Sequence, residues 1–274
     1  DKVKNFSEQT FIVCGQKDYS YKEFYKMCLS TAEHIRYDLN VKQGDALSIC
    51  LENDINFLKT YFACFLLGVK AVTINPALTK REISYIFNDS NSKYLIDRSH
   101  NFINKKIIDE KSLPTVEIDS EAVLIYTSGT TGYPKGVILT HRNLLSDAKA
   151  LSEWFCFNEK TCTMCILPLF HNNGQVTTLL APLTVGGKTV ILNPRSAIMS
   201  FWDIISDKGV TFTSVMPAML SMLTAIGRER KDKTLKAILC GGQPLKPVVQ
   251  KEFEEKYKTK IYEGYGLTET TSFA

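Results

Sequence analysis

Hydrophobic and polar positions along the chain form short apolar runs separated by longer amphipathic stretches. The short runs predict strands and the amphipathic stretches predict helices. The predicted strands cover residues 46–51, 70–74, 93–96, 122–127, 137–140, 161–167, 188–192, 211–215, 237–240 and 259–263. The predicted helices cover residues 20–39, 56–68, 79–89, 141–155, a segment that ends near 185, 197–208, 217–226 and 245–257. Strands that alternate with helices in this way predict an α/β fold with largely parallel sheets.

Local capping signals mark several of these helix boundaries. Ser20 with Glu23, and Thr79 with Glu82, have the three-residue spacing of a capping box, in which each side chain bonds the backbone N–H of the other residue. Gly68 follows a long apolar run and predicts that this helix ends there, because glycine readily adopts the left-handed conformation that follows a helix.

The composition is that of an ordinary globular protein, since 44% of the 274 residues are hydrophobic and 23% are charged. A chain of this length can form a large core and more than one subdomain. The net charge of +4 permits an acidic substrate but does not indicate nucleic-acid binding. We interpret the basic run RERKDK at 228–233 as a solvated turn. The longest apolar runs, such as YFACFLLGV at 61–69, are too short to cross a bilayer.

The eight cysteines indicate a reducing environment. Most lie within apolar runs, where a free cysteine behaves as a small hydrophobic residue, so we expect a cytoplasmic protein rather than a disulfide scaffold. Cys162 and Cys165 form a CxxC pair, but a zinc site needs a second such pair. Their segment predicts a strand, on which residues three apart point to opposite faces. We therefore expect structural roles for both.

The segment LIYTSGTTGYPKGVILTH at residues 124–141 concentrates small polar residues between two apolar runs. Hydroxyl-bearing residues and glycines surround Lys135, and they are Thr127, Ser128, Gly129, Thr130, Thr131, Gly132 and Gly136. Such a segment buries little apolar surface. Its hydroxyls, bare backbone amides and lysine suit a bound polyanion.

The segment at residues 124–141 does not match a Walker loop, which requires Gly-Lys, then Ser or Thr, and then a helix. Pro134 precedes Lys135 and Gly136 follows it. The next residues are largely β-branched and favour a strand. The GGKT at 186–189 lacks the first glycine of the motif, because Pro182 occupies that position, and it predicts a tight turn.

Four motifs together resemble those of the adenylate-forming superfamily, which comprises acyl-CoA synthetases, adenylation domains of non-ribosomal peptide synthesis and luciferases. YTSGTTGYPKG resembles the phosphate loop of that family. LPLFHNNG at 167–174 resembles the motif at the mouth of its acyl pocket. CGGQPL at 240–245 resembles its glycine-rich turn beside adenine, and YEGYGLTET at 262–270 resembles its adenine and phosphate motif. The motifs occur in the expected order.

The resemblance implies the large N-terminal domain of an adenylate-forming enzyme, with two packed, mainly parallel β-sheets flanked by helices. We expect residues 1–274 to form part of that AMP-binding domain. Residues 1–120 would be an α/β part without motifs, and residues 121–274 would carry the ATP-binding motifs. The chain starts at Asp1 and ends soon after Glu269, so we expect a longer parent whose mobile C-terminal domain is absent here. We expect residues 1–274 alone to bind ATP weakly and to be inactive.

The implied activity is the ATP-dependent activation of a carboxylic acid. The carboxylate of the acid, which is ionised at neutral pH, attacks the α-phosphate to give an acyl-adenylate and pyrophosphate, and CoA then forms the thioester. The main obstacle is repulsion between anions, so catalysis is positioning and electrostatic stabilisation rather than activation of a protein nucleophile. The resemblance implies ATP, Mg²⁺ and CoA as the cofactor set, and a fatty or related acyl acid as substrate.

The resemblance also implies roles for individual residues. Lys135 would neutralise phosphate charge, Thr268 would bond the α-phosphate, and Glu269 would help to hold Mg²⁺, which prefers carboxylate oxygen. His171 would lie at the mouth of the acyl pocket, and Tyr265 would stack on adenine. The residues expected to bind the nucleotide are Thr127, Ser128, Gly129, Thr130, Thr131, Gly132, Lys135, Gly241, Gly242, Gln243, Glu263, Gly264, Tyr265, Gly266 and Thr268. The expected catalytic residues are Lys135, His171, Thr268 and Glu269, of which Glu269 is also the metal ligand.

The sequence leaves several alternatives open. An amino-acid substrate is disfavoured, because related amino-acid-activating domains place Asp where this chain has His171, and a buried ammonium without that partner is costly. Gln243 replaces the alanine of many relatives and leaves the shape of the acyl pocket open. A carrier protein could replace CoA as the acceptor, and the domain could bind nucleotide without turnover. His171 and Tyr265 could be structural, and His141, which we expect to follow a Thr140 helix cap, is assigned no chemistry.

Overall fold

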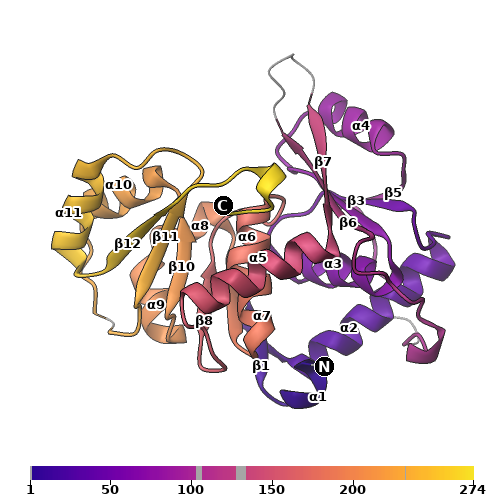
Figure 1. Ribbon diagram of the computed structural model, residues 1–274, viewed down its shortest axis with the longest axis horizontal. Helices are drawn as coiled ribbons and strands as arrows, with labels where there is room; N and C mark the ends of the chain where they lie inside the picture. Colours follow the sequence, from indigo (N-terminus) through magenta and orange to yellow (C-terminus); the bar gives the residue numbers. More distant parts are fainter. Residues whose placement is uncertain (1, 103–106, 128–133, 232) are drawn as a thin grey trace.

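The chain forms two β-sheets with helices between them and on their outer faces (Figure 1). The computed structural model describes residues 2–102, 107–127, 134–231 and 233–274. The strands are β1 (Thr10–Cys14), β2 (Lys17–Ser20), β3 (Ala46–Ile49), β4 (Lys70–Thr73), β5 (Ser92–Ile96), β6 (Glu121–Thr127), β7 (Lys135–Thr140), β8 (Cys162–Cys165), β9 (Lys188–Ile191), β10 (Phe212–Val215), β11 (Ala237–Gly241) and β12 (Lys260–Gly264).

Helices connect most of these strands, as the sequence predicts. The α-helices are α1 (Lys2–Asn5), α2 (Tyr21–Glu33), α3 (Ile55–Leu67), α4 (Lys80–Asp89), α5 (His141–Trp154), α6 (Asn172–Gln175), α7 (Ala181–Val185), α8 (Pro194–Ala197), α9 (Phe201–Lys208), α10 (Pro217–Ile226) and α11 (Pro247–Tyr257). The π- and 3₁₀-helical segments are η1 (His34–Asp38), η2 (Glu110–Ser112), η3 (Val176–Leu180) and η4 (Thr268–Thr270). None of the helices in the described ranges has both the length and the hydropathy needed to span a membrane.

The strand order is β12-β11-β10-β8-β9-β1-β2 in the larger sheet and β5-β3-β4-β6-β7 in the smaller sheet. Among the described strands, neighbours run parallel except in the hairpins β1–β2 and β6–β7. The prediction of an α/β fold with two mainly parallel sheets is therefore confirmed. The hairpin β1–β2 was missed, because β2 is a polar strand at the edge of its sheet and shows no clear apolar alternation.

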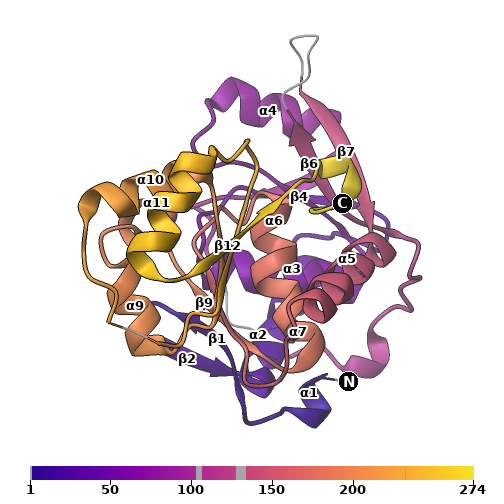
Figure 2. The ribbon, with the colours of Figure 1, turned by 60° about the vertical axis from the view of Figure 1, so that its left-hand side comes forward.

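Figures 1 and 2 show helices packed between and outside the two sheets. Three apolar cores fill these layers. The central core lies between the two sheets and includes side chains of α2, α3, α5 and α7. A second core packs α9, α10 and α11 onto the outer face of the larger sheet, and a third packs α4 onto the outer face of the smaller sheet. Helices thus bury both faces of each sheet, as parallel strands require.

Local signals located several helix boundaries correctly. The capping boxes of Ser20 with Glu23 and of Thr79 with Glu82 both form, and Thr140 caps α5. The amide of Gly68, which has a φ of 61°, bonds the last turn of α3. Each of these signals depends on residues within one helical turn of each other, so it can be recognised without knowledge of the tertiary structure.

Three predicted helices differ from the structure. The helix predicted over 20–39 changes at Glu33 into the π-helical segment η1. The helix predicted to end near 185 is divided into α6, η3 and α7, and the helix predicted over 197–208 starts at Phe201. Apolar residues continue through these changes, so hydrophobic periodicity does not reveal where the hydrogen-bonding pattern changes.

The CxxC pair has structural roles, as predicted. Cys162 packs in the outer core and Cys165 in the central core, on opposite faces of β8. All eight cysteines are free in the structure. Gly186, in the GGKT segment, follows α7 with a left-handed φ of 83° and leads into β9, as the predicted tight turn requires.

Candidate active site

The candidate site lies at the carboxyl ends of parallel strands in the larger sheet. Strands β8, β10, β11 and β12 run parallel, so the loops that follow them meet at one edge, where open α/β sheets bind ligands. These loops enclose a cavity of about 290 Å³. Among the residues lining it are His171, Gly241, Gly242, Gly266 and Thr268. The structure therefore brings together residues from three of the four motifs.

Side chains in and just after strands of the smaller sheet hold the motif that carries His171. Asn53 donates through Nδ2 to the carbonyl oxygen of Leu167 at 2.8 Å and accepts from the amide of Leu169 at 2.7 Å. Thr73 Oγ1 donates to the carbonyl oxygen of Phe170 at 3.0 Å. Asn53 and Thr73 are both buried and did not stand out in the sequence, since an Asn or Thr near the end of a strand is common. Only the packing of one sheet against the other gives them this role.

His171 stands at the N-terminus of α6, with its ring centroid 4.5 Å from that of Phe170. The ring is accessible from the cavity, yet protein surrounds it on the other sides, and this desolvation lowers the pKa of His171. The imidazole is therefore neutral at neutral pH, and it can donate or accept one hydrogen bond without adding charge beside an anionic substrate.

The two residues after His171 connect this motif to the rest of the site. Asn172 Nδ2 donates to the carbonyl oxygen of Thr271, just beyond η4. Ser214 Oγ, on β10, donates to Asn173 Oδ1 at 2.9 Å. Thr271 has a φ of 76°, which is strained for a β-branched residue. Asn172 thus holds a strained turn next to Thr268, a contact that sequence analysis did not anticipate.

The glycines of the site allow backbone and aromatic groups to approach closely. A Cβ atom on Gly266 would collide with the carbonyl oxygen of Ser272. A Cβ atom on Gly241 would lie 2.9 Å from the ring of Phe273, which also covers Gly264. The chain after η4 therefore folds back against the ends of β11 and β12, and Phe273 belongs to the site although it lies outside the recognised motifs.

Five predicted residues of the later motifs do not line this cavity, namely Gln243, Glu263, Gly264, Tyr265 and Glu269. One oxygen of Glu263 accepts from the amide of Leu245 at 2.8 Å, so this carboxylate fixes the glycine-rich turn. The side chain of Tyr265 is 69% exposed, and Gln243 and Glu269 are also exposed. The structure leaves the aromatic face of Tyr265 and the carboxylate of Glu269 accessible to a ligand.

The β6–β7 hairpin approaches the same region from the smaller sheet. Thr127 pairs with Lys135 at its base, and Thr127 Oγ1 donates to the carbonyl oxygen of Lys135 at 3.5 Å. The turn η4, which carries Thr268 and Glu269, lies against β7 (Figure 2). Lys135 is exposed. The predicted residues Ser128, Gly129, Thr130, Thr131 and Gly132 lie outside the described residues.

The described residues contain no group of three or more His, Cys, Asp and Glu side chains that could hold a metal ion by itself. Proteins commonly bind Mg²⁺ through one or two carboxylates together with phosphates of the substrate. Glu269 remains the carboxylate predicted for that role.

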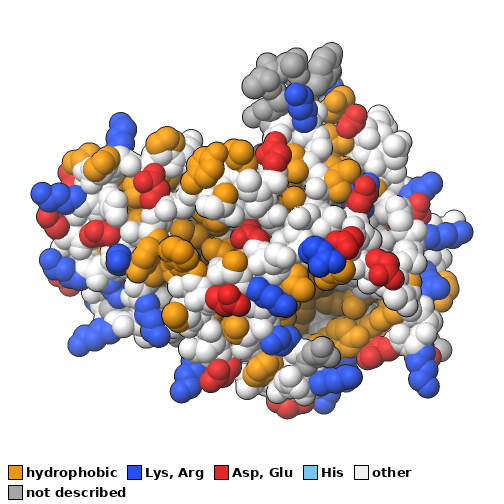
Figure 3. Space-filling view, viewed as in Figure 1, with side chains coloured by type: hydrophobic (Ala, Val, Ile, Leu, Met, Phe, Trp, Pro, Cys, Tyr) orange, Lys and Arg blue, Asp and Glu red, His pale blue; other side chains and the backbone are white. Residues whose placement is uncertain are grey.

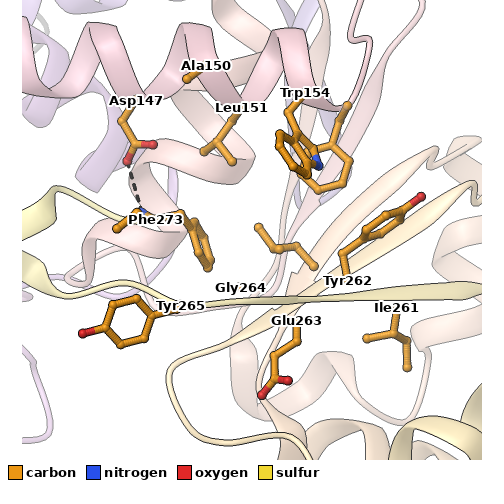
Figure 4. Close-up of a pocket in the computed structure, with 13 residues that line it drawn as sticks. Asp147, Ala150, Leu151, Trp154, Ile261, Tyr262, Glu263, Gly264, Tyr265 and Phe273 are labelled. Carbon is orange, nitrogen blue, oxygen red and sulfur yellow. Dashed lines mark hydrogen bonds between the residues drawn. The ribbon is translucent and has the colours of Figure 1, made fainter.

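A larger hollow of about 510 Å³ lies on the other side of Phe273, between α5 and β12 (Figure 4). Hydrophobic side chains gather over it in Figure 3, and Trp154 at its rim is 76% exposed. Asp147 also lines the hollow and accepts from the amide of Phe273 at 3.4 Å. The predicted residues Glu263, Gly264 and Tyr265 line this larger hollow. The predicted catalytic residues His171 and Thr268 line the smaller cavity, and Glu269 follows Thr268 in η4, which contacts β7, so we place the candidate site at the smaller cavity.

Replacing Asp147 by asparagine should stabilise the protein more at pH 8 than at pH 5. Burial raises the pKa of Asp147 to about 6, above its ordinary value of 3.8. The folded chain therefore resists ionisation of this group, and stability falls as the pH rises from about 4 through 6. With allowance for partial solvent exposure, we expect a difference of about 1 kcal/mol in the effect of Asp147→Asn between the two pH values, measured by urea unfolding.

The control for this experiment is Asp207→Asn, at an exposed position on α9. It should change stability equally at both pH values. An equal effect of Asp147→Asn at pH 5 and pH 8 would contradict the argument from burial.

The family model described as AMP-binding enzyme matches residues 1–274, so the chain belongs to this family. The 2-succinylbenzoate–CoA ligase of Bacillus velezensis is 31% identical over 281 residues, which cover 97% of this chain and 57% of that protein. The 4-coumarate–CoA ligase 3 of Arabidopsis thaliana is 26% identical over 309 residues, which cover 98% of this chain and 54% of that protein. The chain thus spans just over half the length of these curated relatives.

Solved structures agree with this assignment. The o-succinylbenzoate CoA synthetase (MenE) of Bacillus subtilis in complex with the acyl-adenylate OSB-AMP superposes with a TM-score of 0.90 and 28% identity, covering 99% of this chain and 58% of that one. The same enzyme in complex with ATP and magnesium gives a TM-score of 0.89, covering 99% of this chain and 60% of that one. The resemblance to adenylate-forming enzymes, drawn from four motifs, is confirmed.

Proposed function

We propose that the full-length protein is an acid–thiol ligase that joins a carboxylic acid to the α-phosphate of ATP, releases pyrophosphate, and then transfers the acyl group to CoA. The observation that carries this proposal is the convergence of three motifs on one cavity, with His171, Gly241 and Thr268 in its wall. The turn after Thr268 also contacts β7, the strand that begins at Lys135. A carboxylate and a triphosphate held there would meet between these groups.

The residues present fit an ATP–magnesium complex. Lys135 offers an exposed cation at the start of β7, and the turn that contacts this strand carries Thr268 and the exposed carboxylate of Glu269. We propose that Lys135 offsets the charge of the β- and γ-phosphates, that Thr268 donates to the α-phosphate, and that Glu269 holds Mg²⁺. The metal would supply positive charge to the phosphate oxygens when bound. Tyr265, with most of its ring exposed, would cover the adenine.

The cavity favours an acid with an apolar tail. Its apolar lining comes from Leu167, Pro168, Met216, Leu267 and Phe273. The chain places neutral His171, rather than a carboxylate, where an amino-acid substrate would need a partner for its ammonium group. We propose a fatty or related acyl acid, and we include aromatic acids because the relatives named above are 2-succinylbenzoate– and 4-coumarate–CoA ligases.

Other parts of the proposal rest on the sequence. We propose that residues 1–120 and 121–274 form two parts of the domain, of which the second carries the ATP-binding motifs. We also propose a cytoplasmic location, which the eight free thiols support. We further propose that residues 1–274 alone do not turn over ATP. CoA is proposed as the acceptor, by analogy with the CoA ligases that the chain resembles.

A panel of carboxylic acids tests the function. Pyrophosphate release by the full-length protein is measured with ATP, Mg²⁺ and fatty, aromatic and amino acids, and thioester formation is then measured with CoA or with a phosphopantetheinylated carrier protein. We expect pyrophosphate release with apolar acids and transfer to CoA. ATP binding without pyrophosphate release on any acid would indicate a binding module, and transfer to the carrier protein alone would overturn CoA as the acceptor.

Replacing His171 by aspartate should slow activation of the native acid by about 10- to 100-fold. The new carboxylate would face the carboxylate of the substrate across the cavity, and two partly solvated charges a few ångströms apart repel by about 1–3 kcal/mol. The change should not create amino-acid activation, because one new carboxylate does not supply the other contacts that an amino-acid substrate needs. Pyrophosphate release with the native acid and with amino acids measures both effects.

The neutral variant His171→Asn is the control, and it should retain more activity than His171→Asp. Full activity of His171→Asp on the native acid would show that His171 does not lie beside the reacting carboxylate.

A further inference from the structure

Strand β7 is the last strand of the smaller sheet, yet it begins with the lysine on which the proposed function depends. An edge strand has a hydrogen-bonded neighbour on one side, so its position is less constrained than that of a central strand. We call Tyr126, Thr127, Pro134, Lys135 and Gly136 the hairpin base. In the sheet, Tyr126 pairs with Gly136, and Thr127 pairs with Lys135.

Helix α4 bonds two residues of the hairpin base, one on β6 and one just before β7 (Figure 1 shows this helix beside the hairpin). The hydroxyl of Tyr126, on β6, donates to Asp89 Oδ2 at 2.6 Å, and Asp89 is the last residue of α4. The hydroxyl of Tyr85, in the same helix, donates to the carbonyl oxygen of Pro134 at 3.4 Å. Helix α4 therefore bonds one residue near the end of β6 and one residue just before the start of β7.

The ring of Tyr126 also lies against the residue that follows Lys135. A Cβ atom on Gly136 would lie 3.3 Å from Tyr126 Cζ and 2.8 Å from Leu124 Cδ1, so the backbone of β7 is packed directly on these side chains. Burial, together with the hydrogen bond to Asp89, raises the pKa of Tyr126. Its hydroxyl is therefore protonated at neutral pH and can donate to the Asp89 carboxylate. A hydrogen bond to a charged acceptor is stronger than one between neutral groups.

Helix α4 packs on the outer face of the smaller sheet through Ile86. Ile86 is buried in the outer core of the smaller sheet together with Leu124, and Tyr85 and Tyr126 pack against the same core. The capping box of Thr79 and Glu82 fixes the start of the helix. Tyr126, on the inner strand β6, is thus bonded to this helix and packs its ring against Gly136 of the edge strand β7.

We propose that Tyr126 and Asp89 are positioning residues, which set the place of the Lys135 ammonium relative to the β- and γ-phosphates of bound ATP. The proposal rests on the proposed function. Neither residue would touch the nucleotide. Both would act on Lys135 through the backbone of β7. Loss of their hydrogen bond should therefore weaken binding of the triphosphate. Binding of AMP, which lacks the β- and γ-phosphates, should be unaffected.

The test compares ATP with AMP by calorimetric titration of the full-length protein in the presence of Mg²⁺. We expect Tyr126→Phe and Asp89→Ala each to weaken ATP binding by about 3- to 10-fold, as for a hydrogen bond to a charged group, and to change AMP binding by less than about twofold. The double variant should be no weaker than either single variant, since both remove the same hydrogen bond. Asp89→Asn, which keeps an acceptor oxygen, should retain most of the ATP affinity.

Two controls separate this role from general destabilisation. Tyr37→Phe removes a hydroxyl from an exposed tyrosine in η1, and Ser84→Ala changes an exposed position of α4. Neither should affect either nucleotide. Equal weakening of ATP and AMP in the Tyr126 and Asp89 variants, no weakening of either, or additive losses in the double variant would overturn the proposal. A wild-type protein that binds neither nucleotide would overturn the proposed function itself, and the inference with it.

Discussion

Replacing Lys135 by alanine is expected to slow pyrophosphate release by the full-length protein by about 100- to 10,000-fold, the loss typical of removing a preorganised electrostatic group from an active site. Lys135 is exposed at the start of β7, the strand that the turn of Thr268 and Glu269 contacts. In the proposed reaction, one anion attacks another, so a cation on the phosphates lowers the barrier without any proton transfer. The rate of pyrophosphate release at saturating acid measures the loss.

Two companion variants make this result specific to the charge of Lys135. Lys149→Ala removes an exposed lysine from α5 and should leave the rate unchanged. Lys135→Arg keeps the charge but alters its geometry, so an intermediate rate is expected. Pyrophosphate release by Lys135→Ala at the wild-type rate would remove this lysine from the mechanism.

Replacing Gly266 by alanine should abolish most activity, with a loss of at least about 100-fold in pyrophosphate release. The new methyl group would collide with the carbonyl oxygen of Ser272 and lie 2.7 Å from its carbonyl carbon. These are backbone atoms, so the chain itself must move. Asn172 holds Thr271, the residue before Ser272, and the amide of Phe273, the residue after it, donates to Asp147. Any movement of Ser272 therefore disturbs its neighbours on both sides in the chain.

The same substitution should lower the free energy of unfolding by about 1–3 kcal/mol, as overpacking does elsewhere. Denaturant unfolding alongside the activity assay separates the two effects. The matched control is Gly209→Ala after α9, where the added atom would meet open space at a φ of 65°. It should cost about 1 kcal/mol in stability and leave activity intact. Wild-type activity in Gly266→Ala would show that the turn tolerates displacement, and that its position does not control the reaction.

The sequence by itself determined the features that depend on residues close together in the chain. Alternating apolar and amphipathic segments predicted the α/β class, and pairs such as Ser20 with Glu23 predicted the starts of helices. The motif around Lys135 was recognisable because a cluster of glycines, hydroxyls and one lysine has few purposes other than binding an anion. The π-helical segments η1 and η3 were not predicted, because the spacing of apolar residues changes little where a helix changes from α- to π-helical hydrogen bonding.

Only the tertiary structure decided which distant segments lie together. The order of strands in the larger sheet brings His171, Gly241 and Thr268 to one edge, although they come from separate motifs. Asn53 holds the segment before His171 from the other sheet. Asn, Asp, Tyr and Phe are ordinary residues in a sequence. Their roles arise from contacts over long separations in the chain, such as that between Tyr126 and Asp89, and such contacts are set by how the two sheets and their helices pack.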